Sequence, residues 1–271
     1  MTLTRPFRFP RHAMITAGLT LVLALGAAGT SSASSARVVS DLNHVTSVTG
    51  EPEAQRLYNA LVALELPSAW PFATYNPISS GGVRLGNLNV ELGAGTSPLA
   101  GDQFATFEPP SLNGLTADLD SRGIRHSPLL PLYNGNELFY TRVELPTYSQ
   151  TSRFTAQFCA YNFPSGKPTR VAPTNKAGVI NVARVILNTR KPESWRKLMA
   201  PSKPSVDGTY RLPSGPLVQV RKSRSDAIAS LELRVRNVAR AARAFKGAGI
   251  KTKGSTVSIG TLHLRLKASG S

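Results

Sequence analysis

The sequence predicts an α+β fold in which a unit of one strand, one helix and two or three further strands occurs four times. Segments with strict polar–apolar alternation, typical of half-buried strands, lead into helical segments and then into more alternating segments, in units of roughly 50–65 residues. A second observation is a change of charge, because residues 37–164 carry 7 basic and 11 acidic side chains whereas residues 165–271 carry 22 and 4. Together these observations indicate two tandem domains of two units each.

Residues 1–36 have the three-part layout of a secretory signal peptide. Arg5, Arg8 and Arg11 form a basic start, an apolar run of about 16 residues follows, and small residues offer cleavage after Ala33 or Ala36. The alternative is an uncleaved membrane anchor, but the run is shorter than the ~20 apolar residues of a spanning helix. The sequence therefore predicts a secreted protein whose functional part begins near residue 37.

The first domain, residues 37–164, is predicted to contain two units. Its helices cover residues 51–65, with Leu57, Leu61, Val62 and Leu64 on one face, and residues 111–124, with Ser111 as the N-cap and Gly123 at the end. Strands are predicted at 41–48, around 82–86, and at 88–93, 104–108, 138–145 and 154–161.

Residues 165–178, rich in Pro, Gly, Ser and Thr, are predicted to be a linker, and residues 179–271 form the basic second domain. Its helices are predicted at 192–200, which begins with proline, and at 238–249, which Asn237 caps. Its strands are predicted at 179–189, in two short pieces between 208 and 222, at 229–236, and in two pieces between 256 and 268.

Charge indicates the class of partner for the second domain. A basic density of 22 in 107 residues favours anions such as phospholipid head groups, wall polymers or acidic small molecules. Its only aromatic residues are Trp195, Tyr210 and Phe245, which leaves few stacking platforms and argues against sequence-specific nucleic-acid binding. The single cysteine, Cys159, excludes an internal disulfide and is expected to be a buried thiol.

Three segments carry a resemblance to a known family: DLNHVTSV at residue 41, GGVRLGNLNVELG at residue 81 and VRNVARAARAFKGAGI at residue 235. In this order they resemble the vicinal oxygen chelate superfamily, the glyoxalase, bleomycin-resistance and dioxygenase fold, and the first half resembles glyoxalase-like domain proteins most. The resemblance implies two tandem glyoxalase-like domains built from four βαβββ modules. Four modules in one chain imply a self-sufficient monomer.

The resemblance also implies one divalent metal ion as cofactor, held at positions that correspond to His44, Glu91, Phe104 and Gln157. His44, Glu91 and Gln157 are the candidate ligands, since phenylalanine cannot ligate, and Glu91 is the candidate catalytic ligand or base. The implied activity is that of a lyase, isomerase or dioxygenase on a small molecule with vicinal oxygens. The alternative is that His44 is a structural histidine and that Glu91 merely faces water.

In the second half the corresponding positions are Ala183, Gln219, Ser230 and Arg265, which abandon the metal pattern. Strand alternation instead places basic side chains on one face, and the candidate anion-binding residues are Arg221, Arg234, His263 and Arg265. The second hypothesis is thus a non-catalytic module that binds a small anionic ligand. A third is attachment by charge to an anionic cell-surface polymer or lipid, and for both the alternative is that these side chains lie in water at strand ends.

Overall fold

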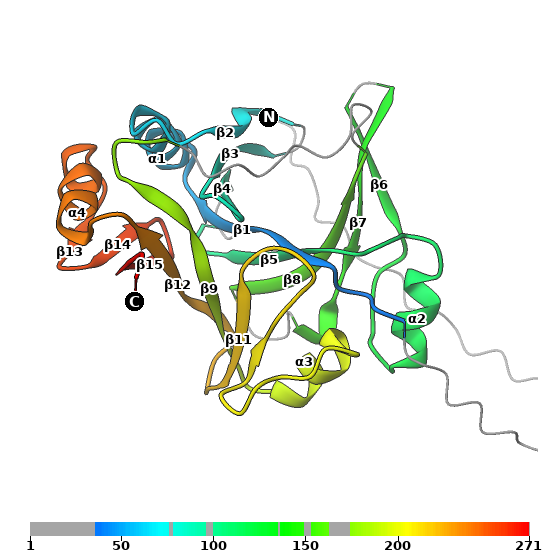
Figure 1. Ribbon diagram of the computed structural model, residues 1–271. Coiled ribbons are helices and arrows are strands. Elements are labelled where there is room, and N and C mark those ends of the chain that lie inside the picture. Colours follow the sequence, from blue (N-terminus) through cyan, green and yellow to red (C-terminus); the bar gives the residue numbers. More distant parts are fainter. Residues whose placement is uncertain are drawn as a thin grey trace, which may run out of the picture. The chain divides into compact units, whose positions relative to one another are not determined.

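Two mixed β-sheets organise the chain (Figure 1). The computed structural model describes residues 36–75, 78–95, 100–134, 136–148, 153–162 and 174–270. The predicted signal peptide, but for Ala36, and residues 165–173 of the predicted linker lie outside the described residues. The four units follow one another along the chain as predicted, so the α+β prediction is confirmed.

The first sheet has eight strands in the order β2-β3-β4-β1-β5-β8-β7-β6. β1 and β5 form its antiparallel centre, and β4 and β8 run parallel to them on either side. The elements are β1 Asp41–Thr49, α1 Glu51–Ala63, β2 Ser68–Thr74, β3 Ser79–Arg84, β4 Asn89–Ala94, β5 Gln103–Glu108, α2 Leu115–Ser121, β6 Leu130–Asn134, β7 Glu137–Glu144, a 3-10 turn Pro146–Tyr148 and β8 Phe154–Tyr161.

The second sheet has seven strands in the order β10-β11-β9-β12-β15-β14-β13. β9 and β12 form its antiparallel centre, as β1 and β5 do in the first. The elements are β9 Val179–Thr189, α3 Pro192–Met199, β10 Thr209–Tyr210, β11 Leu217–Lys222, β12 Ala227–Val235, α4 Val238–Gly247, β13 Thr252–Lys253, β14 Thr256–Ile259 and β15 Leu262–Ala268. Within the described residues the third unit has only two strands after its helix.

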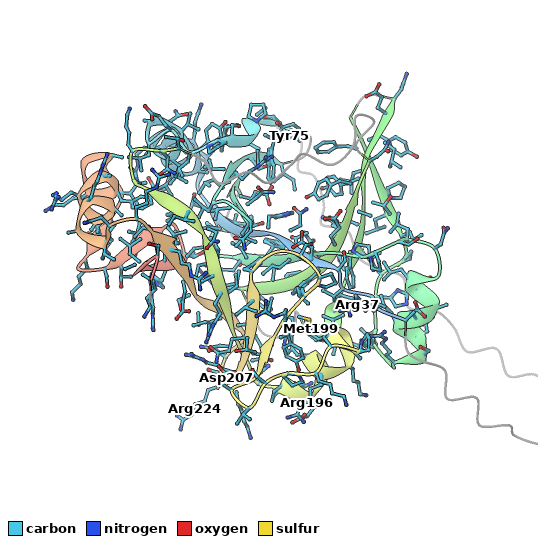
Figure 2. The ribbon with its side chains drawn as sticks, viewed as in Figure 1. Arg37, Tyr75, Arg196, Met199, Asp207 and Arg224 are labelled. Carbon is cyan, nitrogen blue, oxygen red and sulfur yellow. The ribbon has the colours of Figure 1, made fainter. Side chains whose placement is uncertain are left out.

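The core lies on one face of each sheet, because alternate strand residues are apolar and fully buried. In the first sheet Val45, Leu92 and Phe107 are 0% exposed, and α1 packs on β3 and β4 through its own apolar face. Trp195 of α3 packs edge-on against Phe107, with ring centroids 5.9 Å apart. Figure 2 shows Met199 on the side of α3 toward the sheets and Arg196 on the outer side.

Several polar contacts among the described residues join the two halves of the chain. The side chain of Gln103 on β5 accepts from the backbone N–H of Ile228 at 2.7 Å and donates to the carbonyl of Thr261 at 2.9 Å. Ser47 on β1 accepts from the backbone N–H of Thr261 at 2.9 Å. The turn before β4 also lies against β9, where Asn87 accepts from the backbone N–H of Val182 at 2.9 Å.

The pattern did not predict three of the observed strands, β2, β6 and β13, and the first two each contain a proline, Pro71 and Pro131. β2 and β6 are at the edges of the first sheet, where a residue without an N–H is tolerated. The predicted cap Ser111 was wrong: α2 begins after Gly114 in a left-handed conformation, and the Ser111 hydroxyl accepts from Asn113 instead.

The predicted cap Asn237 is confirmed, since its side chain accepts from the Arg240 N–H at 2.8 Å. The predicted apolar face of α1 was wrong at Val62, which is 38% exposed. Among the described helices none is both long and apolar enough to cross a bilayer.

Candidate functional site

The first sheet carries a row of polar side chains on the face opposite its core. Residues that pair across neighbouring strands point to the same face. His44 on β1 pairs with Thr106 on β5, which pairs with Gln157 on β8. Two residues further along β1, on the same face as His44, Thr46 pairs with Glu91 on β4. Glu91 thus points away from the face of its neighbours Val90 and Leu92, as its alternation with them predicts. We call this surface the His44 face.

The first sheet curls toward the His44 face. Trp70 lies on β2, three strands from β1, yet its ring centroid is 5.8 Å from that of His44. Tyr161 lies on β8, two strands away on the other side, and its ring is 6.3 Å from the same imidazole. Tyr75, just after β2, stacks on Phe139 of β7 at 6.1 Å, which joins opposite arms of the sheet (Tyr75 is labelled in Figure 2). The His44 face is therefore concave and walled by aromatic rings.

A glycine makes the approach of Trp70 possible. Gly82 on β3 pairs with Trp70 on one side and with Glu91 on the other. A Cβ atom at Gly82 would lie 2.5 Å from Cδ2 of the indole, which is closer than van der Waals contact allows. The absent side chain lets the indole lie over β3.

Hydrogen bonds hold His44 in one orientation. The amide of Asn43 donates to Glu108 at 3.1 Å, which turns its Oδ1 toward Nδ1 of His44 at 3.1 Å. The hydroxyl of Tyr161 lies 3.3 Å from the same Nδ1, so Asn43 and Tyr161 together hold this ring nitrogen. The other ring nitrogen, Nε2, faces Oε2 of Glu91 at 3.4 Å, and the same carboxylate oxygen accepts from the hydroxyl of Thr46 at 2.6 Å.

These contacts keep the carboxyl group of Glu91 ionised. Burial alone would raise the pKa of Glu91, but hydrogen bonds and charge from His44, with hydrogen bonds from Thr46 and Ser80, outweigh burial and lower it. The side chain of His44 is only 4% exposed, whereas that of Glu91 is 21% exposed. A fixed anion thus reaches solvent beside a buried imidazole.

Neighbouring hydroxyl and thiol groups remain protonated. Burial, with the negative charge of Glu91 nearby, raises the pKa of Tyr140 to about 12 and that of Tyr161 well above its usual value. Burial and the charge of Glu91 also raise the pKa of the Cys159 thiol. Cys159 is a free, buried cysteine, so the expected buried thiol is confirmed. At neutral pH both phenols therefore keep their protons beside one carboxylate.

Comparison with known proteins adds the family of folds. No family model matches the sequence, and no curated protein matches it either. Solved structures do match across most of the chain. A hypothetical protein from Staphylococcus aureus has a TM-score of 0.56 at 8% identity and covers 84% of this chain and 98% of its own.

Homoprotocatechuate 2,3-dioxygenase from Arthrobacter globiformis has a TM-score of 0.52 at 8% identity and covers 85% of this chain and 81% of its own. A catechol 2,3-dioxygenase has a TM-score of 0.50 at 11% identity, covering 86% and 89%. These dioxygenases belong to the vicinal oxygen chelate superfamily. This chain has the vicinal oxygen chelate fold. The predicted fold class, with two tandem glyoxalase-like sheets, is confirmed; identities this low establish the fold alone.

The residues present on the His44 face do not fit the metal ion that the vicinal oxygen chelate resemblance implies. His44 and Glu91 supply two donors, but the residue paired with His44 on β5 is Thr106, and Phe104 pairs with Thr46. Gln157 donates its amide to the Thr106 hydroxyl at 3.1 Å rather than to either candidate ligand. Among the described residues no three His, Cys, Asp or Glu side chains converge as a metal site would require.

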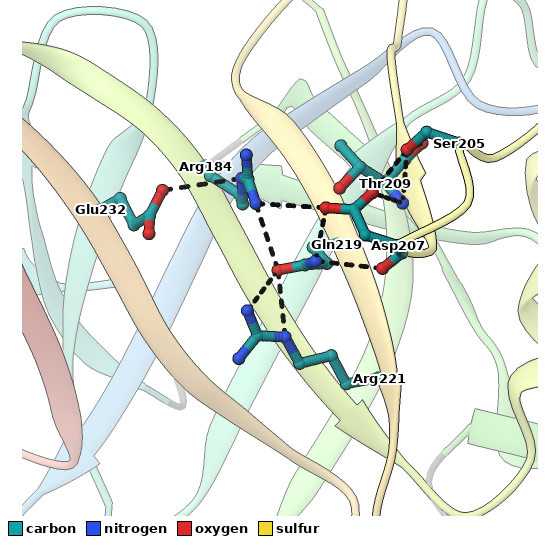
Figure 3. Close-up of polar contacts among 7 residues, drawn as sticks. All are labelled: Arg184, Ser205, Asp207, Thr209, Gln219, Arg221 and Glu232. Carbon is teal, nitrogen blue, oxygen red and sulfur yellow. Dashed lines mark hydrogen bonds and ion pairs between the residues drawn. The ribbon is translucent and has the colours of Figure 1, made fainter. Parts of the chain in front are cut away.

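The second sheet has an ion pair at the centre of its vicinal oxygen chelate unit. Arg184 on β9 pairs with Glu232 on β12, with Nε 3.6 Å from the carboxylate, and lies 3.5 Å from Asp207 (Figure 3). Gln219 on β11 donates to Asp207 at 2.9 Å and accepts from Arg221 at 2.7 Å. The charged side chains on the central strands of the second sheet therefore already have partners within the protein.

The four predicted anion-binding residues share the face of Arg184 but are not gathered at one point. Arg265 pairs with Glu232 in the strand register, Arg221 bonds Gln219, and His263 lies 3.2 Å from the hydroxyl of Ser258. Only Arg234 borders a cavity. The sequence reasoning missed Arg184 because a bulge in the β9–β12 ladder shifts the alternation by one residue.

Proposed function

We propose that the chain binds a small oxygen-rich molecule on the His44 face and that the His44–Glu91 pair takes the place of a resident metal. The observation that carries this proposal is a fixed, partly exposed carboxylate beside a buried imidazole, in a concave face walled by Trp70 and Tyr161. Aromatic walls favour a flat ligand, and a carboxylate favours ligand hydroxyl groups.

Each group on the His44 face has a role in this binding. Glu91 accepts a hydrogen bond from a ligand hydroxyl, and the protonated phenol of Tyr140 donates to a ligand oxygen. Trp70 packs on the ring or carbon skeleton. A bound molecule with two neighbouring oxygens would satisfy both the acceptor and the donor.

The lowered pKa of Glu91 favours recognition over proton transfer. A general base works best when its pKa lies near the working pH, and enzymes raise carboxyl pKa values by burial to achieve this. On the His44 face the hydrogen bonds to Glu91 lower the pKa instead. Glu91 is therefore proposed as a hydrogen-bond acceptor for the ligand rather than as the catalytic base.

Tryptophan fluorescence tests the proposal, because the chain has two tryptophans and Trp195 is 1% exposed in the core. Catechol is the probe, and 1,2-dimethoxybenzene, which lacks hydroxyl donors, is its matched control. With excitation near the red edge of indole absorption, catechol should quench emission saturably. Glu91→Gln should weaken its affinity about tenfold or more, the value of a charge-assisted hydrogen bond.

Two controls make the outcome decisive. Trp70→Phe should abolish the fluorescence change while calorimetry still detects catechol binding. Equal affinity of catechol and its dimethyl ether, or of the parent and Glu91→Gln, would rule out recognition of ligand hydroxyls by Glu91.

A second proposal is attachment of the second half to an anionic cell surface after export. It is favoured by one stripe of exposed cations on α4, formed by Arg240, Arg243 and Lys246. We expect vesicles with phosphatidylserine to retain the chain at low ionic strength and release it at moderate salt, since exposed charges are screened within about 8 Å at physiological ionic strength. Retention by neutral vesicles would contradict attachment by charge.

A further inference from the structure

A cavity of about 350 Å³ lies on the Arg184 face of the second sheet, apart from the His44 face. Its floor is the start of β9, at residues 181–183, together with Arg234 near the end of β12. Asn181 and Arg234 are cross-strand partners, so their side chains rise from the floor side by side. The remaining wall is the loop of residues 211–217, and Asn87 closes the rim from the first half.

The walls are held in place by contacts of their own. Ser214 of the loop donates its backbone N–H to the carbonyl of Ser40 at 3.2 Å, and Pro213 and Pro216 restrict the backbone around it. On the opposite rim, Gly86 has φ +75°, and a Cβ there would lie 2.8 Å from Cα of Asn181. The cavity is therefore framed by both halves of the chain, and its size falls in the usual range for small-molecule sites.

The charges around the cavity are unbalanced. Arg184, on the same face, is matched by Glu232 at 3.6 Å and Asp207 at 3.5 Å. The guanidinium groups of Arg211 and Arg234, which line the cavity, form no ion pair and no hydrogen bond with any described residue. No acidic residue is among the lining residues. Two guanidinium groups thus border a cavity whose lining residues include no carboxylate; the carboxylate of Asp41 is buried behind Gly215 in the wall.

Asn181 adds a hydrogen-bond acceptor beside the two guanidinium groups, which can only donate. Its Oδ1 is buried and has no hydrogen-bond partner among the described residues. A buried acceptor without a partner costs free energy unless a ligand or water donates to it. A ligand that carries both an anionic group and a hydroxyl would meet the two arginines and this oxygen together.

We propose that this cavity binds a small hydroxylated oxyanion, a phosphate ester or hydroxy acid, through Arg211 and Arg234, with Asn181 accepting from its hydroxyl group. Guanidinium groups bind such oxyanions by paired, charge-assisted hydrogen bonds. The site does not depend on the His44–Glu91 pair.

The test is calorimetric titration of the purified chain at low salt with glycerol 3-phosphate and, separately, with lactate. Glycerol, which has the hydroxyls without the charge, is the matched ligand control. Saturable binding is expected for one or both anions and none for glycerol, and the stronger anion identifies the phosphate or the carboxylate class. Each of Arg211→Gln and Arg234→Gln should weaken binding about tenfold.

Arg224→Gln is the matched protein control, because Arg224 is exposed in the turn between β11 and β12 and does not line the cavity (labelled in Figure 2). It removes the same charge and should leave the affinity within about twofold. Asn181→Ala should weaken the binding of glycerol 3-phosphate more than that of inorganic phosphate, because inorganic phosphate has no glycerol hydroxyl for Asn181 to accept from. Equal losses in all three arginine variants would show attraction by net charge only and overturn the site, as would the absence of binding by both anions.

Discussion

Glu91→Gln should destabilise the folded chain at neutral pH and do so progressively less in acid. The carboxylate oxygen of Glu91 accepts from Thr46 at 2.6 Å and lies 3.4 Å from His44 Nε2. A hydrogen bond to a charged group contributes about 1.5–3 kcal/mol to stability. The expected loss is smaller, because the Glu91 side chain is 21% exposed and the glutamine can still accept from Thr46. We therefore expect a loss of about 1–2 kcal/mol at pH 7.

The sign of the pH dependence follows from the lowered pKa. A carboxyl whose pKa is lower in the folded than in the unfolded chain stabilises the fold above its ordinary value of 4.5, and that contribution disappears as the pH falls through the folded value. Glutamine does not titrate, so the difference between parent and variant should be constant from pH 7 to about pH 5 and narrow below about pH 4.5.

Urea denaturation of parent and variant at pH 7.0, 5.5, 4.0 and 3.5 measures this difference. At pH 7 the expected loss of stability should lower the melting temperature of Glu91→Gln by about 2–8 °C, since 1 kcal/mol shifts the melting temperature of a chain of this size by ~2–4 °C. Glu137→Gln is the control, since Glu137 is exposed and in no ion pair with a described residue. A loss that is the same at pH 7.0 and pH 3.5 would refute the assignment of Glu91 as an ionised partner of His44.

Three further predictions concern side-chain packing and the hydrogen bonds between the two sheets. Gly82→Ala places a methyl group 2.5 Å from the Trp70 indole, so it should displace the ring and weaken catechol binding while leaving a folded circular dichroism spectrum; unchanged quenching would contradict the account of this wall. Gln103→Leu leaves the Ile228 N–H and the Thr261 carbonyl without their partner. It should lower the free energy of unfolding, measured by urea denaturation, by about 2–5 kcal/mol. A loss below about 1 kcal/mol would show that the sheets hold together without this contact. Trp195→Ala opens a cavity in the core and should cost about 3–5 kcal/mol by the same assay, with catechol affinity unchanged wherever the variant is folded.

The order of elements could be predicted because local patterns decide it. The predicted ranges of β8 and β9 coincide with the observed strands, and Asn237 caps α4 as expected. What the pattern could not show is where strands are irregular. A bulge between Leu42 and His44 shifts the register by one residue and places Thr106 rather than Ala105 opposite His44, and no alternation within one strand reveals the register of its neighbour.

Tertiary curvature explains the rest of what the sequence did not indicate. Trp70 lies in a proline-containing edge strand that does not read as a strand, and it reaches His44 only because the sheet curls and Gly82 leaves room. Arg211 lies in a loop whose position depends on contacts with β1, so no spacing rule connects it with Arg234.

Metal content is the sharpest test of the proposal that the His44–Glu91 pair takes the place of a resident metal. The purified chain, with His44→Ala and Glu91→Ala variants beside it, is incubated with Fe²⁺, Mn²⁺ or Zn²⁺, dialysed and assayed by inductively coupled plasma mass spectrometry. We expect far less than one metal ion per chain in all three proteins, because two protein donors do not hold a divalent ion through dialysis. One ion per chain in the parent and none in either variant would show that the His44–Glu91 pair is a metal centre.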